Sequence, residues 1–274
     1  MVVEGIFSPT HVRGHPWEMF FIGLVYSMLA VFLSLWVFKG HASIVMVAFT
    51  VIAALPFVHR MISMEEEYDL THNSERTLMQ EHSRAICMFV LLFIGMVAGY
   101  SLLYFMLPDA LVIDVFEAQH GAINADVAAT GNFISPTAAL STILANNLVV
   151  LMLSVLFSFL YGAGALFIIT WNASVMAAVI GYFIKTNLLE SGGSYLAVTS
   201  QGLIRYLLHG IPEIAAFMVA GLASGIISFA LLKHDWNSPN FKLVLKDASF
   251  LFMLSLVFVL MAGMIEVYIT PVFY

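Results

Sequence analysis

The longest charge-free stretch of this chain most strongly constrains what it can fold into. Fifty-eight consecutive residues, from Val127 to Ile184, contain no Asp, Glu, Lys, Arg or His. About a quarter of the residues in a soluble domain are charged, so such a gap is not typical of one. From Leu140 to Ile184 the stretch is also strongly apolar. It is long enough for two helical passes of roughly 20 residues each through a hydrocarbon core.

Composition extends this prediction to the whole chain. Of its 274 residues 61% are hydrophobic and 10% are charged, and the mean hydropathy is +0.97. We therefore predict an all-α fold, a polytopic transmembrane bundle in which residues 1–274 form a single integral membrane domain. The net charge of −7, without a basic patch, disfavours a nucleic-acid partner. Cys87 is the only cysteine, so no intrachain disulfide and no multi-cysteine metal site can form.

Seven apolar segments are predicted to span the membrane. Three form an N-terminal group within residues 17–107, three lie within a core of residues 140–232, and the last covers residues 248–269. We also expect a short interfacial helix from Ser191 to Leu208, where polar and apolar residues alternate irregularly. The break between the fourth and fifth spans falls at Gly162 to Gly164, which could be a turn or only a kink. The predicted spans are Trp17–Phe38, Ala42–Val58, Ala85–Leu107, Leu140–Tyr161, Ala165–Ile184, Ile214–Leu232 and Ala248–Ile269.

The distribution of basic residues predicts the orientation. Cytoplasmic connectors are enriched in Lys and Arg. With the N-terminus in the cytoplasm, three basic residues lie outside: Lys39, Lys185 and Arg205. The other seven lie inside, and the long connector of residues 108–136, without Lys or Arg, falls outside. We therefore expect a multi-pass protein of the cell membrane, N-terminus in and C-terminus out. If residues 162–164 formed only a kink in one helix, the orientation of all later spans in the membrane would be inverted.

Polar side chains at lipid depth are the candidates for function. The amides of Asn146, Asn147 and Asn172 interrupt the apolar stretch, and such groups are costly unless they find partners. The sequence from His209 to Glu213 is predicted to open the sixth span, with a proline at the first helical position. Glu213 then either meets the positive end of the helix dipole as a start signal or serves as a functional carboxylate.

The predicted topology places Asn146, Asn147 and Glu213 in the same outer part of the bundle, whereas Asn172 is expected roughly 10 Å from the other end. We therefore expect Asn147 and Glu213 to face each other or to share a polar cavity. Asn146, Asn172 and His209 complete this candidate intramembrane site. The alternative is that the amides only join helices, each contributing about 0.6 kcal/mol. Glu266 is left out, because it lies three residues from the expected end of the seventh span and contact with interfacial water explains it.

Metal, cofactor and catalytic chemistry are not indicated. His209 and Glu213 have the spacing of a helical ligand pair, but the predicted helix start separates them and catalytic zinc needs three protein ligands. We expect no metal, no cofactor and no catalytic residue. Small residues are instead expected to let helices approach closely or to form hinges. These are Gly162, Gly164, Gly181, Gly210, Gly221 and Gly225.

An ordered set of these motifs resembles the stage II sporulation protein M family, in particular its archaeal branch. The resemblance is most specific from Leu140 to Leu232. The N-terminal part fits the family more loosely, in residues 16–20, in the acidic connector of residues 60–84, and in residues 81–82 within it. The motifs are Asn146-Asn147, Tyr161-Gly162-Ala163-Gly164-Ala165, Thr170-Trp171-Asn172-Ala173-Ser174-Val175, His209-Gly210-Ile211-Pro212-Glu213, and the glycines Gly221 and Gly225.

The resemblance implies the fold and the membrane location, and three functions remain open. The family's bacterial namesake is a scaffold that works beside cell-wall hydrolases, and archaeal envelopes lack that wall polymer. A non-enzymatic scaffold or assembly factor of the envelope is our first expectation. The alternative is a permease or channel subunit whose path is lined by Asn147, Asn172, His209 and Glu213. An intramembrane hydrolase using His209 and Glu213 is the third. The expected partners are the lipid bilayer and other membrane proteins or a second copy of the chain.

Overall fold

The structure is an all-helical bundle. The computed structural model describes residues 15–71, 75–130, 135–161, 164–191 and 195–273, and these contain no strand. Seven helices are long and apolar enough to cross a membrane. The all-α fold and the seven spans predicted from the sequence are thereby confirmed. The long helices are α2 (Glu18–Val37), α3 (Ala42–Thr71), α4 (Glu75–Met106), α7 (Pro136–Tyr161), α8 (Ala165–Ser191), α9 (Tyr195–Lys233) and α10 (Pro239–Met264).

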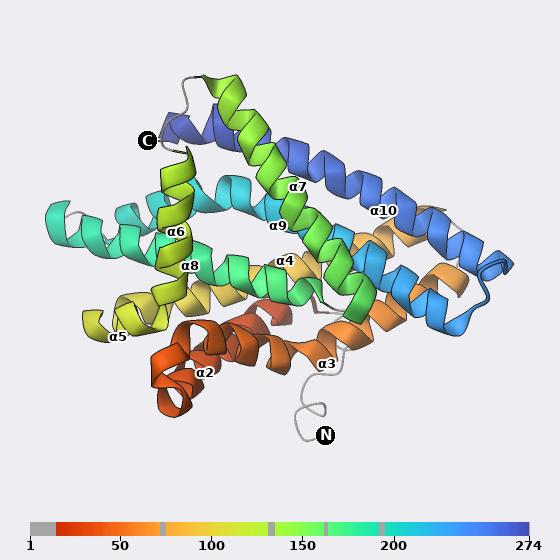
Figure 1. Ribbon diagram of the computed structural model, residues 1–274, viewed down its shortest axis with the longest axis horizontal. Helices are drawn as coiled ribbons and strands as arrows, with labels where there is room; N and C mark the ends of the chain where they lie inside the picture. Colours follow the sequence, from red (N-terminus) through yellow and green to blue (C-terminus); the bar gives the residue numbers. More distant parts are fainter. Residues whose placement is uncertain (1–14, 72–74, 131–134, 162–163, 192–194, 274) are drawn as a thin grey trace.

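Shorter helices connect or terminate these spans. A 3₁₀ turn, η1 (Lys39–His41), links α2 to α3, and α5 (Asp109–Val115) and α6 (Glu117–Thr130) follow α4. The chain ends in a π-helical stretch, η2 (Ile265–Ile269), and a 3₁₀ turn, η3 (Thr270–Phe273). The connector between α4 and α7 is therefore largely helical. In Figure 1, α6 stands across the end of the bundle, over α8, and α5 lies beside the end of α4.

Local sequence signals explain several of these boundaries. Ser238 caps α10, because its hydroxyl accepts a hydrogen bond from the backbone N–H of Phe241 at 3.1 Å and Pro239 occupies the first turn. Pro108 precedes α5, and Asp109 and Glu117 place carboxylates in the first turns of α5 and α6. These two short helices begin where polar residues meet the positive ends of helix dipoles.

The fourth and fifth spans are two separate helices. α7 ends at Tyr161 and α8 begins at Ala165, while residues 162 and 163, including the predicted packing residue Gly162, lie outside the described residues. Figure 1 shows α7 and α8 meeting near this point and diverging away from it. The two spans are thus separate helices and not one kinked helix. A Cβ at Gly164 would overlap the carbonyl oxygen of Phe157.

The sixth span differs from the prediction in one important respect. We expected an interfacial helix up to Leu208 and a new helix starting at Pro212, but α9 runs without interruption from Tyr195 to Lys233 with Pro212 inside it. Proline is tolerated in membrane helices because neighbouring helices and local adjustments satisfy the freed backbone groups. Glu213 is therefore in the middle of a helix and does not mark its start.

Glycines allow α2 and α4 to pack closely. A Cβ at Gly23 would overlap the carbonyl oxygen of Leu92, and one at Gly95 would overlap that of Phe20. A Cβ at Gly99 would overlap the hydroxyl of Ser27. Small residues at such contacts let helix backbones approach, which drives association where lipid replaces water. These three glycines were not among the predicted packing residues.

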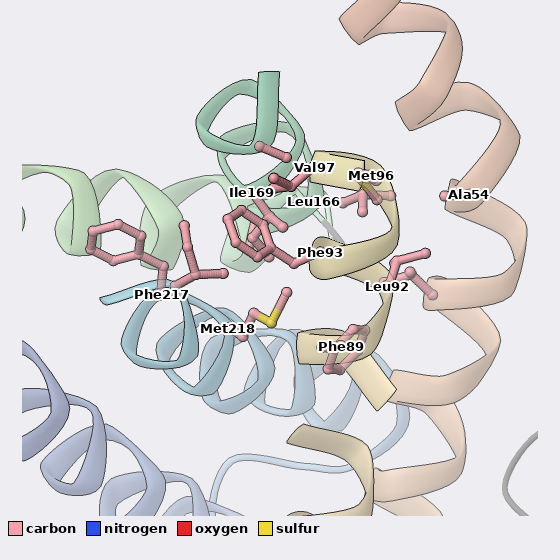
Figure 2. Close-up of a cluster of buried hydrophobic side chains, with 14 of the residues drawn as sticks. Ala54, Phe89, Leu92, Phe93, Met96, Val97, Leu166, Ile169, Phe217 and Met218 are labelled. Carbon is pink, nitrogen blue, oxygen red and sulfur yellow. The ribbon is translucent and has the colours of Figure 1, made fainter. Parts of the chain in front are cut away.

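The tightest packing lies around α9, the most buried of the seven spans. Figure 2 shows its side chains meeting those of α3, α4 and α8 in an apolar cluster that we call the closed half. A space of about 20 Å³ lies between these helices, enough for about one water. The labelled residues of the closed half are Ala54, Phe89, Leu92, Phe93, Met96, Val97, Leu166, Ile169, Phe217 and Met218.

Candidate functional site

A large cavity lies towards the end of the bundle where α5 and α6 are found. Its volume is about 2130 Å³, and α4, α5, α6, α7, α8, α9 and η2 contribute to its wall. We call this region the open half. Small-molecule sites commonly measure about 300–1,000 Å³, so this cavity is larger than a small ligand needs. All five candidate residues line it: Asn146, Asn147, Asn172, His209 and Glu213.

Asn147 is the least satisfied polar group of the cavity wall. Its side chain is only 4% exposed, and its Nδ2 is buried without a hydrogen-bond acceptor. Leaving a buried donor unpaired costs about 1–3 kcal/mol. The neighbouring Asn146 also lines the cavity but is exposed. The open half thus contains a buried donor that a bound acceptor would satisfy.

Asn172 lies on α8 and lines the same cavity. Its Nδ2 donates to the carbonyl oxygen of Ile168 at 2.8 Å, one turn earlier in the same helix. This bond satisfies the amide nitrogen locally and fixes the side-chain orientation. Asn172 is half-buried in the cavity wall, next to Trp171, which also lines the cavity.

His209 and Glu213 lie on one face of α9. Because the helix continues through Pro212, their spacing of four residues places them one turn apart on the same side. Both are half-buried. Nδ1 of His209 lies 3.4 Å from Oγ1 of Thr270, and that hydroxyl donates to the carbonyl oxygen of Ile265 at 3.1 Å. The expected separation of the pair by a helix start was wrong.

Glu266 belongs to the same wall, although the sequence analysis left it out. It lies in the π-helical stretch η2, half-buried, and lines the cavity. Single π-helical turns are frequent at functional sites because they change the direction of side chains within a helix. Glu213 and Glu266 both also interact with other groups of the protein.

Two residue pairs that sequence reasoning missed lie at the α5 and α6 side of the cavity, which we call its mouth. Lys185 of α8 forms an ion pair with Asp109 of α5, and the hydroxyl of Tyr104 lies 3.0 Å from Nε2 of His120 on α6. All four line the cavity. Burial lowers the pKa of His120 below its ordinary value of 6.5, so the ring is neutral at pH 7. Tyr104 and His120 are 16 residues apart in the sequence, and Asp109 and Lys185 are 76 residues apart. No local sequence pattern links residues at these separations.

A buried glutamine attaches α6 to the bundle. Gln119 is fully buried, and its Nε2 donates to the carbonyl oxygen of Ser43 at 3.2 Å and to Oγ of Ser174 at 3.0 Å. These bonds connect α6 to α3 and α8. The mouth of the cavity is therefore held by side-chain hydrogen bonds and not by loops alone.

Three more of the predicted packing glycines lie at close helix contacts. The ring of Tyr104 would be 2.6 Å from a Cβ at Gly181, and a Cβ at Gly210 would overlap Met176. A Cβ at Gly221 would overlap that of Ala165. Gly225 is buried in α9.

The charge of the lining is acidic. Among the lining residues that the structure describes, Asp109, Glu213 and Glu266 carry carboxylates and Lys185 pairs with Asp109. In the part of the chain that the structure describes, no group of three or more His, Cys, Asp or Glu residues could hold a metal ion. The wall can thus donate from amides, accept from carboxylates and attract a positive charge.

Comparison with known protein families gives a match over most of the chain. The family model described as Stage II sporulation protein M matches residues 85–271, about two thirds of the chain and all of the cavity wall except Ile44. The match does not distinguish an archaeal branch, which stays a prediction. Neither the curated proteins nor the solved structures include a significant match.

Proposed function

The chain belongs to the stage II sporulation protein M family, and we propose that it is a permease-type membrane protein that binds a polar ligand in its open half. The observation that carries this proposal is Asn147, whose buried Nδ2 lacks an acceptor in the wall of a cavity of about 2130 Å³. A ligand oxygen that accepts from this amide would offset its desolvation cost. The ligand leaves unchanged in this proposal, so the protein is not an enzyme.

The location of Glu213 also supports ligand binding. A carboxylate that only marked a helix start would lie at a helix end in water, whereas Glu213 lies within α9 and lines the cavity. Ionisable residues within membrane spans are usually functional and face a cavity or the bundle interior. Together with His209 one turn earlier, Glu213 would bind a cationic or hydrogen-bonding group.

We also propose which membrane contains the protein and how the protein is oriented in it. The seven spans and the family support a multi-pass membrane protein. We propose that it lies in the cell membrane with its N-terminus in the cytoplasm, which would place the mouth of the cavity outside. Ligand would then reach the open half from the extracellular side.

A scaffold of the cell envelope is the second candidate. The closed half favours it, because the described side chains of the apolar cluster pack around a void of only about 20 Å³. A permease must open this half during its cycle, whereas a scaffold need not. The two candidates therefore differ in whether the closed half ever becomes accessible to water.

Cysteine accessibility tests this difference. Cys87 is the only cysteine, so Cys87→Ala gives a background without thiols. In this background, Asn172→Cys probes the open half and Leu222→Cys, at a buried position beside the 20 Å³ void, probes the closed half. Sealed vesicles containing the full chain are treated with a membrane-impermeant maleimide from each side. Val257→Cys, exposed on α10 away from the cavity, is the control for lipid-facing positions.

A permease predicts that Asn172→Cys reacts from the side of α5 and α6, and that Leu222→Cys reacts from the opposite side. Reaction of Asn172→Cys from the first side alone, with Leu222→Cys protected from both, would reject the permease and favour the scaffold. Failure of Asn172→Cys to react from either side would reject an aqueous cavity altogether.

A further inference from the structure

The cavity of the open half extends through much of the membrane thickness. Its wall follows α7 from Pro136 to Leu153, which corresponds to about 25 Å at 1.5 Å per residue. On α8 the wall extends from Thr186 back to Phe167, which is about 28 Å by the same measure. The hydrocarbon core of a bilayer is about 30 Å thick. A ligand that fills this cavity therefore lies within the bilayer for most of its length.

Asn147 lies near the middle of this depth. It is about 16 Å from the start of the span Pro136–Phe159, whose 24 residues extend about 36 Å. Its buried Nδ2 has no acceptor among the described residues, and the hydrocarbon core of the bilayer offers none. An acceptor for this amide must therefore be brought to mid-depth by whatever occupies the cavity.

The wall beyond Asn147 is apolar and opens sideways. Val150, Leu153, Phe167 and Ile168 line the cavity there, farthest from α5 and α6 along the two helices. Leu153 and Phe167 are nevertheless 39% and 42% exposed. α7 is the least buried of the seven spans, and it diverges from α8 in Figure 1. Because both helices span the membrane, this exposed apolar surface faces the acyl chains of the bilayer.

A ligand that is polar throughout does not match this wall. Its polar groups would satisfy Asn147 but would leave the apolar residues beyond it facing water or polar atoms, without the gain from removing apolar surface from water. A hydrocarbon chain covers this surface and reaches it directly from the bilayer. The volume of about 2130 Å³ exceeds the roughly 300–1,000 Å³ of common small-molecule sites, so a polar group and a chain both fit.

We infer that the ligand of the open half is a membrane lipid, bound with an oxygen atom of its polar group near the mid-depth of the bilayer. This oxygen accepts a hydrogen bond from Nδ2 of Asn147, and a hydrocarbon chain lies along Val150, Leu153 and Phe167. The lipid enters between α7 and α8. Hydrogen bonding and apolar contact define this ligand class, whatever the charge of the headgroup. The inference rests on the proposed function, because it identifies the ligand class of the same cavity.

Photolabelling of the full chain in lipid nanodiscs tests this inference. The probe is a neutral diacylglycerol with a photoreactive diazirine close to its ester group, and labelled peptides are mapped by mass spectrometry. Lipids that only surround the protein hold their ester groups near the membrane surface and would label the ends of the spans. We expect label instead in residues 143–150 of α7, at the depth of Asn147.

Removal of the donor tests the polar contact. Asn147→Leu should lower the label in residues 143–150 about tenfold, as expected for one hydrogen bond to a buried group. Ser141→Ala is the matched control, because it removes an exposed hydroxyl of α7 that does not line the cavity. The label should be unchanged in this control.

Added bulk on α7 tests the position of the chain. Val150→Trp and Leu153→Trp add bulk inside the cavity and should also lower the label about tenfold. Val149→Trp and Met152→Trp add the same bulk on the exposed outer face and should leave the label unchanged. Two variants of each kind keep the test valid if one of them fails to fold.

Three results would overturn this inference. The first is label confined to the ends of the spans, and the second is label in residues 143–150 that persists in Asn147→Leu, Val150→Trp and Leu153→Trp. The third is equal competition by unlabelled diacylglycerol and by monoacetin, which has ester and hydroxyl groups without a long chain. That result would mean a soluble ligand, and the proposed permease would then stand. The cysteine experiment uses no lipid probe, so failure of the permease and failure of the lipid assignment are distinguishable.

Discussion

The closed half and the open half of this bundle are built from the same helices but fill space differently. In the closed half, side chains of α4, α8 and α9 interlock and leave about 20 Å³ between them. In the open half, the same three helices and α7 surround about 2130 Å³ lined by amides, carboxylates and histidines. The chain can therefore pack its helices tightly where apolar side chains predominate.

The difference indicates where stability and ligand binding are located. Tight apolar packing contributes dispersion energy to the folded state and favours a single arrangement of the side chains. A polar cavity contributes little to stability and contains an unpaired buried group. Proteins retain such features at functional sites, at some cost in stability. Substitutions in the two halves should consequently have opposite effects, and four measurements test this comparison.

The largest effect is expected in the closed half. Phe93→Ala removes a fully buried ring from the cluster of Figure 2 and should lower the free energy of unfolding by about 3–5 kcal/mol. Phe32→Ala, at an exposed position of α2, is the control. Unfolding of both variants in detergent micelles measures the difference. Equal losses would show that the closed half is not the main source of stability.

A smaller loss is expected at the contact between α2 and α4. A Cβ in Gly95→Ala would overlap the carbonyl oxygen of Phe20, and backbone cannot move aside as a side chain can. The helices must separate, which should cost about 1–3 kcal/mol. Gly40→Ala, with no atom within 4 Å of its Cβ, should unfold like the wild type. The same measurement applies, and a stable Gly95→Ala would contradict the close packing of these helices.

A substitution in the open half should act in the opposite direction. Asn147→Leu keeps the approximate size of the side chain and removes a buried donor without an acceptor, so it should raise the free energy of unfolding by up to about 1 kcal/mol. A marked loss of stability would mean instead that Asn147 joins helices and that the amide is structural. Asn146→Leu, next to it but exposed, is the comparison.

The smallest effect concerns pH and should be confined to the open half. Burial lowers the pKa of His120, so the unfolded chain takes up this proton before the folded one as the pH falls. The contribution of neutral His120 to the free energy of unfolding is therefore fully present above about pH 6.5, the ordinary histidine pKa. This contribution decreases at lower pH until His120 is protonated in the folded protein too. Melting temperatures at neutral and mildly acidic pH measure this decrease. His120→Gln should reduce it, and an unchanged decrease would assign it to other histidines.

Much of the fold could be predicted because the relevant signals are local. Apolar length and the absence of charge located the seven spans, and the glycines after Tyr161 marked the turn between α7 and α8. Amides in an apolar stretch pointed to the wall of a cavity, since lipid offers them no partners. The five candidate residues do line one cavity, although their role remains a proposal.

The remaining features depend on contacts between distant residues. Pro212 carries the local signal of a helix start, but packing of the surrounding helices keeps α9 continuous. Glu266 enters the cavity wall through a π-helical turn that its sequence does not announce. The pairs at the mouth, Asp109 with Lys185 and Tyr104 with His120, exist only because α5 and α6 fold back over α4 and α8.

Pro212 has a mechanical consequence for the site. Without an N–H it donates nothing to the carbonyl oxygen of Leu208, so the ladder of backbone hydrogen bonds in α9 is interrupted between His209 and Glu213. α9 can flex at this point at less cost than elsewhere along its length. Bending there would move the imidazole with one arm of the helix and the carboxylate with the other, and so change the spacing of the two groups.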